Sequence, residues 1–125
     1  MRIKHFNIEI GAQLYMACAD VSRLRILSLI MRNGKMCVSD LEQILNFTQA
    51  KTSRHLAYLR NSGIVTADKY YQWAYYSVKD EVYDVVKQML QFLQRDATLL
   101  RDQEAFQTLF TNRELALAKL KGLKN

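Results

Sequence analysis

Apolar residues recur every three or four positions along most of the chain, as they do on one face of a helix. This spacing predicts six helical stretches, at about residues 7–18, 21–33, 39–45, 49–61, 81–95 and 99–121. In the last stretch, "TNRE" at residues 111–114 can restart a helix, or one helix can run straight through. The pattern indicates a mainly helical protein without internal repeats.

Residues that start and stop helices stand at the expected boundaries. Asp20 and Thr48 each precede a helical stretch and can cap it with a side-chain oxygen. Ser39 and Glu42 are three residues apart, a capping-box pattern that predicts a helix start. Gly34 follows a helical stretch and suits the left-handed position that ends a helix.

The segment "IVTADKYYQWAYYSV" at residues 64–78 has the composition of strands, with β-branched and aromatic residues in partial alternation. It predicts a hairpin with its tip near residues 69–72, although no Asn-Gly pair fixes the register. We expect the aromatic side chains mainly to close the core. Two short helices joined by a few residues, then a hairpin, predict a winged helix-turn-helix: mainly α with a small β-hairpin wing.

Composition and charge bound the class of protein. The 125 residues suit one compact domain, and 18 basic against 12 acidic residues give a net charge of +6, which favours a nucleic-acid partner. No apolar run approaches a membrane span, and the start does not resemble a signal peptide. Two cysteines are too few for a disulfide framework and fit a reducing compartment. We expect a cytoplasmic protein with no membrane partner.

Four stretches together resemble the ArsR/SmtB family of bacterial transcriptional repressors: "ACADVSRLRILSLI", "KMCVSDLEQIL", "TQAKTSRHLAYLRNSGIV" and "WAYYSV". The chain departs from the family in having Val21 where Pro often follows the aspartate, and Tyr70-Tyr71-Gln72 where the wing tip usually has Gly. The resemblance implies a homodimeric winged-helix regulator that binds double-stranded DNA, with residues 1–96 as the DNA-binding domain and 97–125 as a helical extension. It leaves the operator, the effector and the sign of regulation open, and repression is the expectation.

The resemblance identifies residues 49–61 as the recognition helix, and the basic side chains on this helix agree with that role. The alternative is that these charges only keep a surface helix solvated and bind no DNA. His55 adjoins the apolar Leu56, so it can form an internal hydrogen bond or contact DNA. The candidate DNA-binding residues, including two on the wing, are Thr48, Gln49, Lys51, Ser53, Arg54, His55, Lys69 and Gln72.

The first helix and the helix after the wing carry apolar residues beyond what one small core requires. The candidate residues for a two-fold interface are Leu14, Cys18, Val82, Val86, Met89 and Leu93. The alternative is that these residues cap the core of the monomer. The extension at residues 97–125 can enlarge that interface or cover it.

The metal sites implied by the family are incomplete. One common site needs a second thiol two residues after Cys37, where this chain has Ser39. A zinc version pairs Cys37 with Asp40, but His5 in the N-terminal arm has no cysteine beside it, and the helix after the wing has no histidine. We predict no metal and no cofactor. A redox switch between Cys18 and Cys37 stays open, because the sequence does not fix their separation.

Other classes of function fit less well. No set of nucleophile, base and orienting group is visible, and no Gly-rich phosphate loop, so we do not expect an enzyme. The alternative to a DNA-binding regulator is a winged-helix protein-interaction module that no longer reads DNA. A neutral or acidic recognition face would favour that module, whereas Lys51, Arg54 and Arg60 disfavour it.

Overall fold

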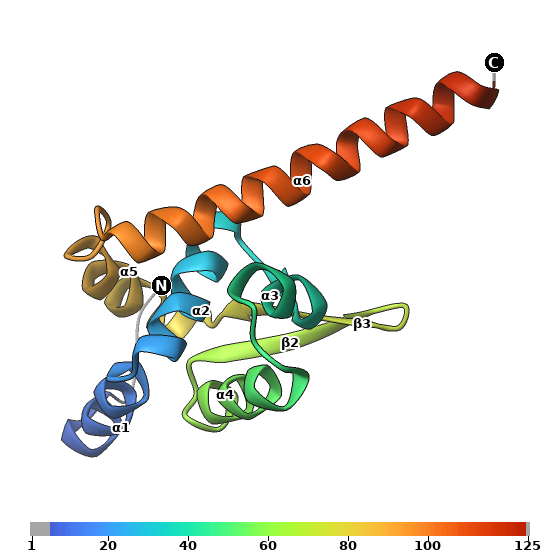
Figure 1. Ribbon diagram of the computed structural model, residues 1–125. Helices are drawn as coiled ribbons and strands as arrows, with labels where there is room; N and C mark the ends of the chain where they lie inside the picture. Colours follow the sequence, from blue (N-terminus) through green and yellow to red (C-terminus); the bar gives the residue numbers. More distant parts are fainter. Residues whose placement is uncertain (1–5, 125) are drawn as a thin grey trace.

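The computed structural model describes residues 6–124 and is mainly helical, with a small antiparallel sheet (Figure 1). The elements in chain order are α1 (Ile8–Cys18), α2 (Val21–Asn33), β1 (Met36–Cys37), α3 (Val38–Leu45), α4 (Gln49–Asn61), β2 (Val65–Tyr70), β3 (Trp73–Val78), a short 3-10 helix (Asp80–Val82), α5 (Tyr83–Gln91) and α6 (Ala97–Lys124). Helices α3 and α4 form the helix-turn-helix, and β2 and β3 form the wing. The predicted winged helix is confirmed.

The wing belongs to a three-stranded sheet in the order β1-β3-β2. Strands β2 and β3 pair antiparallel down to Tyr70 opposite Trp73, which leaves a two-residue turn at the tip. On the other side of β3, the two-residue strand β1 pairs Met36 with Tyr76. The sequence predicted only two strands, since a strand of two residues leaves no alternation to detect.

Three of the predicted helix boundaries are confirmed by their hydrogen bonds or backbone angles. The Asp20 carboxylate accepts from the Arg23 N–H at 3.0 Å and caps α2. The Thr48 hydroxyl accepts from the Lys51 N–H at 3.1 Å and caps α4. Gly34 ends α2 with φ of +87°, a conformation that residues with a side chain rarely adopt.

The capping box predicted at the start of α3 is wrong. The helix begins one residue earlier, at Val38, and its cap residue Cys37 makes no side-chain hydrogen bond to the helix. Ser39 therefore lies inside the first turn, with its hydroxyl 3.4 Å from the Cys37 sulfur. Because Cys37 pairs in β1 immediately before α3, strand pairing sets the start of the helix without a side-chain cap.

The core lies between α2, the helix-turn-helix, the sheet and the inner faces of α1 and α5. It includes Leu14, Cys18, Val82 and Val86, each at most 8% exposed within the single chain. A side chain enclosed by its own chain has no surface left for a partner. These four residues were candidates for a two-fold interface, and their burial within the single chain instead supports the alternative that they belong to the core of the monomer. Met89 and Leu93 are half-buried.

Helix α5 ends at Gln91, earlier than predicted, and α6 is one continuous helix that does not restart at residue 111. The first half of α6 lies across α2 and α3, and its second half projects away from the body (Figure 1). Most side chains of that second half are exposed. The helical extension is thus packed against the winged helix mainly through its first half, and one residue of the second half, Arg113, also reaches the body.

Paired polar side chains hold α6 in place. Asp102 is buried and binds the Arg25 guanidinium through two hydrogen bonds of 2.9 Å. The side-chain amides of Asn33 and Gln103 bond reciprocally, both at 2.9 Å. Further along the helix, Arg113 binds both carboxylate oxygens of Asp40 in α3. No helix among residues 6–124 is long and apolar enough to cross a membrane.

Candidate nucleic-acid interface

Helix α4 has one face in the core and one in solvent. The buried residues are Thr52, His55, Leu56 and Leu59, which recur at helical spacing. The exposed residues are Gln49, Ala50, Ser53, Arg54, Ala57, Tyr58, Arg60 and Asn61. A polar helix face that is fixed to a rigid core can be offered to a large ligand without rearrangement.

The middle of this exposed face is built from small side chains. Ala50, Ser53 and Ala57 follow one another at spacings of three and four residues, so they form one row along the helix. Small residues in the row let the helix backbone come close to the floor of a groove. Arg54 and Arg60 lie on the two sides of this row, where their long side chains can reach base edges or phosphates.

The N-terminus of α4 is well ordered by its cap. Besides capping with its hydroxyl, Thr48 accepts at its carbonyl oxygen from the Thr52 hydroxyl at 2.9 Å. Gln49 opens the helix and is exposed. The first-turn N–H groups of a helix carry a partial positive charge, which suits a phosphate oxygen.

Lys51 lies on the flank of α4, beside the turn that joins α3 to α4. Its ammonium nitrogen is 4.0 Å from the centre of the Phe47 ring. This cation–π contact keeps the charge near the helix N-terminus, where a phosphate can approach. Lys51 is half-exposed, and Ser53 and Arg54 are exposed.

His55 lies inside the motif. Its side chain is only 11% exposed, and its Nδ1 lies 3.4 Å from a guanidinium nitrogen of Arg23. Because a guanidinium can only donate, Nδ1 accepts and the neutral ring carries its proton on Nε2. Burial lowers the pKa of His55 below 6.5, and the nearby Asp20 carboxylate opposes that shift only in part. The burial of His55 corrects its assignment as a DNA contact.

Arg23 fixes α4 relative to the preceding helices, and sequence reasoning missed this role. Its Nε donates to the Ala17 carbonyl oxygen at 2.6 Å. Its guanidinium carbon lies 4.1 Å from the centre of the Tyr58 ring on α4. Arg23 therefore joins the end of α1, the start of α2 and the flank of the recognition helix. Helical periodicity could not reveal it, since all three partners are distant in the chain or belong to the backbone.

The tip of the wing is exposed and aromatic. Tyr70 is 63% exposed, Tyr71 78% and Trp73 44%, so these three side chains do not close the core as predicted. Tyr71 has φ of +58°, a conformation that Gly adopts more readily. The candidates Lys69 and Gln72 are exposed at the same tip. A charged, aromatic hairpin tip is suited to contacts with a sugar-phosphate backbone.

The recognition helix and the wing lie side by side. The chain passes directly from α4 into β2, and the Ile64 N–H donates to the Leu59 carbonyl oxygen at 3.0 Å. In Figure 1, α4 runs alongside β2 and the hairpin tip extends beyond the helix. The exposed face of α4 and the wing tip can therefore contact one extended ligand at two places.

The thiols and acids of the predicted metal and redox sites are engaged elsewhere. Cys18 and Cys37 are both free and buried, and burial raises the pKa of Cys18, which disfavours its reactive thiolate form. Asp40 is bound by Arg113. His5 lies outside the described residues. Within residues 6–124, no three His, Cys, Asp or Glu side chains lie close enough together to hold a metal ion.

Comparison with known proteins finds a match over residues 20–67 to the model of the family "Bacterial regulatory protein, arsR family". The chain is 42% identical over 77 residues to the arsenic resistance transcriptional regulator ArsR1 of Pseudomonas putida, covering 62% of this chain and 60% of ArsR1. It is 38% identical over 90 residues to ArsR2 of the same organism, covering 71% of this chain and 78% of ArsR2. It thus spans less than two thirds of the length of ArsR1.

Two further similarities concern a repressor and a solved structure. The chain is 39% identical over 69 residues to the arsenical resistance operon repressor of Bacillus subtilis, covering 55% of this chain and 66% of that protein. Among crystal structures, the transcriptional regulator HlyU of Vibrio vulnificus superposes with a TM-score of 0.59 at 34% identity, covering 66% of this chain and 85% of HlyU. Both relatives are regulators of transcription by name.

Proposed function

Because the chain belongs to the arsR family of bacterial regulatory proteins, we propose that it binds double-stranded DNA at specific sequences and regulates transcription in the cytoplasm. Repression is the favoured sign, since a regulator seated on an operator blocks a promoter by occupying it. We propose no catalytic activity and no bound cofactor. The arsenic resistance that the names of the relatives mention is not carried over to this chain, because Ser39 stands at the position of the second thiol.

The observation that carries this proposal is the outward face of α4. It combines a row of small residues with flanking hydrogen-bonding and cationic side chains, on a helix that the core holds rigidly. The major groove of B-DNA admits one α-helix, and residues of the recognition helix read base edges there. We assign base contacts to Gln49, Ser53 and Arg54, and phosphate contacts to Thr48 and Lys51.

The wing supplies a second contact with the DNA. Lys69 and Gln72 at its tip are assigned to the sugar-phosphate backbone next to the groove. The exposed Tyr70 and Tyr71 join them, since planar side chains can pack on sugars. The exposed side of α4 carries no acidic residue. This disfavours the alternative of a protein-interaction module that no longer reads DNA.

We propose that the regulator acts as a homodimer through the outer face of α1. One winged helix reads a single half-site, and a dimer reads two half-sites about one helical turn apart. Ile8 is 80% exposed, Tyr15 55% and Met16 65%, an apolar surface on the side of α1 away from the core. The buried Leu14 and Cys18 lie on the opposite side of the same helix. A second copy with the same surface would cover these side chains.

Selection of binding sites from a random duplex library tests DNA recognition and identifies the operator sequence. The purified, reduced protein is incubated with duplexes of about 30 base pairs, long enough for two half-sites. We expect enrichment of a motif with two-fold symmetry. Fluorescence anisotropy should then show tighter binding to the enriched duplex than to a scrambled one, with affinity falling as salt rises. No enriched motif, and equal weak binding to all duplexes, would favour the protein-interaction module.

Sedimentation velocity tests the dimer. Met16→Glu places a charge on the apolar surface of α1 and should shift the protein toward the monomer. Gln107→Glu is the matched control, because Gln107 is exposed on α6 and gains the same charge outside α1. Equal dimer fractions in the two variants would remove α1 from the interface.

A further inference from the structure

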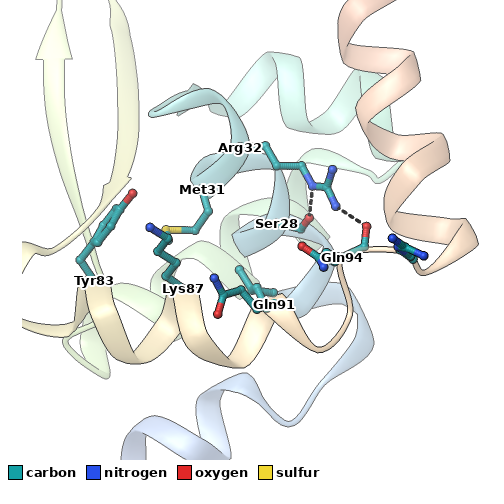
Figure 2. Close-up of a pocket in the computed structure, with 9 residues that line it drawn as sticks. Ser28, Met31, Arg32, Tyr83, Lys87, Gln91 and Gln94 are labelled. Carbon is teal, nitrogen blue, oxygen red and sulfur yellow. Dashed lines mark hydrogen bonds between the residues drawn. The ribbon is translucent and has the colours of Figure 1, made fainter.

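A pocket lies between α2 and α5, and none of the residues assigned to DNA contacts lines it. Its volume is about 500 Å³, within the range of small-molecule sites. One wall comes from α2 and the other from α5 and the turn after it (Figure 2). Tyr83, Lys87 and Gln91 follow one another every four residues, so they line the pocket from one face of α5.

The lining carries a concentrated positive charge. Arg32, Lys87 and Arg95 all line the pocket, and none of its lining residues is an aspartate or glutamate. Three cations that line one open pocket raise the positive potential there, and this potential attracts an anion.

Arg32 is held in position rather than left to move in solvent. Its Nε donates to the Ser28 hydroxyl at 3.2 Å, and one terminal nitrogen donates to the Gln94 carbonyl oxygen at 3.0 Å. Figure 2 shows both bonds: the first lies within α2, and the second joins α2 to the turn after α5. A guanidinium has five N–H donors, so these two bonds leave donors for a ligand. A fixed guanidinium loses little freedom when it binds a carboxylate or phosphate.

The remainder of the lining suits a compact organic body. Met31 from α2 and Leu90 from α5 supply apolar surface, and Tyr83 supplies an aromatic ring with a hydroxyl. Figure 2 shows Met31 on α2 and Lys87 on α5, on the two walls of the pocket. In such a site the apolar walls contact the hydrocarbon part of a ligand, and the charged groups bind its acid group.

We propose that this pocket binds a small organic anion, with its carboxylate or phosphate group held by Arg32, Lys87 and Arg95 and its body against Met31 and Leu90. Charge-assisted hydrogen bonds to the acid group supply the selectivity for anions. The binding reaction involves the chain alone and needs no DNA, so its test is independent of the proposed function.

Titration by protein NMR tests the site with three probes: benzoate, phenyl phosphate and the neutral benzyl alcohol. We expect saturable one-to-one binding of at least one anion, with chemical-shift changes concentrated at α2 and α5, and weaker binding of benzyl alcohol. The stronger of the two anions then identifies the acid group. Absence of saturable binding below about 10 mM for both anions, or equal binding of the alcohol, would overturn the proposal.

Two variants assign the binding to this pocket. Lys87→Gln removes a cation from the pocket wall, and Lys119→Gln removes one from the exposed second half of α6. We expect Lys87→Gln to lower the affinity for the anion about five- to tenfold, since solvent screens part of the attraction. Lys119→Gln should change this affinity less than twofold. The NMR spectrum of each variant reports whether the fold is kept. Equal weakening by both would show general attraction to a basic protein and overturn the site.

Discussion

The recognition helix α4 and the C-terminal helix α6 are both attached to the same body, but by different means. Helix α4 is held by side chains fully enclosed in the core, such as Leu56 and Leu59, which are at most 1% exposed. Helix α6 buries only a few apolar side chains, such as Leu99, and polar pairs also hold it. The most enclosed of these pairs joins Arg25 to Asp102. Apolar burial gives α4 its stability, whereas specific hydrogen bonds give α6 its register.

The largest effect is expected from Leu56→Ala, which removes apolar contacts beneath the recognition helix. Leu56 is 1% exposed, and a cavity there should lower the free energy of unfolding by about 4 kcal/mol. Leu117→Ala is the matched control on α6, where Leu117 is 55% exposed and should cost less than about 0.5 kcal/mol. Urea unfolding measures both. Similar losses in the two variants would mean that α6 is packed as α4 is.

Asp102→Ala tests the polar attachment of α6. The substitution leaves the half-buried Arg25 guanidinium without its partner and should lower the free energy of unfolding by about 3 kcal/mol, as for other enclosed ion pairs. Glu104→Ala, on an exposed position of the same helix, should change it by less than about 0.5 kcal/mol. If thermal unfolding shows no difference between these variants, α6 is held mainly by apolar contacts instead.

Arg54→Ala removes a side chain from the exposed face of α4 without touching its buried face. Operator affinity should fall by about 2 kcal/mol if Arg54 reads a base, while stability to urea stays unchanged. Arg101→Ala on α6 removes an equal charge from another exposed position and serves as the control. Anisotropy titrations that give the same affinity for both variants would remove Arg54 from the interface.

The smallest expected effect is the pH dependence of stability that arises from His55 on the buried face of α4. Burial lowers the pKa of His55, so the unfolded chain takes up this proton near pH 6.5 and the folded protein only at lower pH. Protonation of His55 therefore favours unfolding as pH falls below 6.5. Above that pH, His55 is neutral in both states and makes no pH-dependent contribution to stability. Denaturation at pH 7 and pH 5 should show a smaller loss of stability for His55→Gln than for the unchanged protein. Identical losses would mean that His55 titrates as an exposed group.

The difference between α4 and α6 also explains what the sequence could reveal. The bounds of α4 followed from its cap at Thr48 and its periodic apolar residues, both local signals. The contacts of Arg23 with α4 and of Asp102 with Arg25 could not be predicted, since they join residues far apart in the chain and follow no spacing rule. Periodicity identified the buried positions Leu14 and Val86 but could not distinguish a monomer core from a dimer interface.

The candidate site was predicted in the same uneven way. Exposure of Gln49, Ser53 and Arg54 follows from helical phase, because Leu56 and Leu59 fix the opposite face. His55 lies at the edge of the buried face, where helical phase alone fits both a DNA contact and an internal hydrogen bond. Its contact with Arg23 in the structure supports the internal hydrogen bond. The exposed aromatics of the wing tip were missed because the strand register, which the turn residues left undefined, determines which rings leave the core.

The central claim, that the exposed face of α4 binds DNA, is tested most directly by a charge placed in its middle. Ala57→Glu puts a carboxylate in the row of small residues, where it would face the polyanion, and Ala118→Glu adds the same charge to an exposed position of α6. Anisotropy titration against the selected duplex should show at least a tenfold loss for Ala57→Glu, since like charges in contact cost on the order of kilocalories. Ala118→Glu should retain nearly full affinity. Equal affinities for the two variants would contradict the assignment of α4 as the DNA-reading surface.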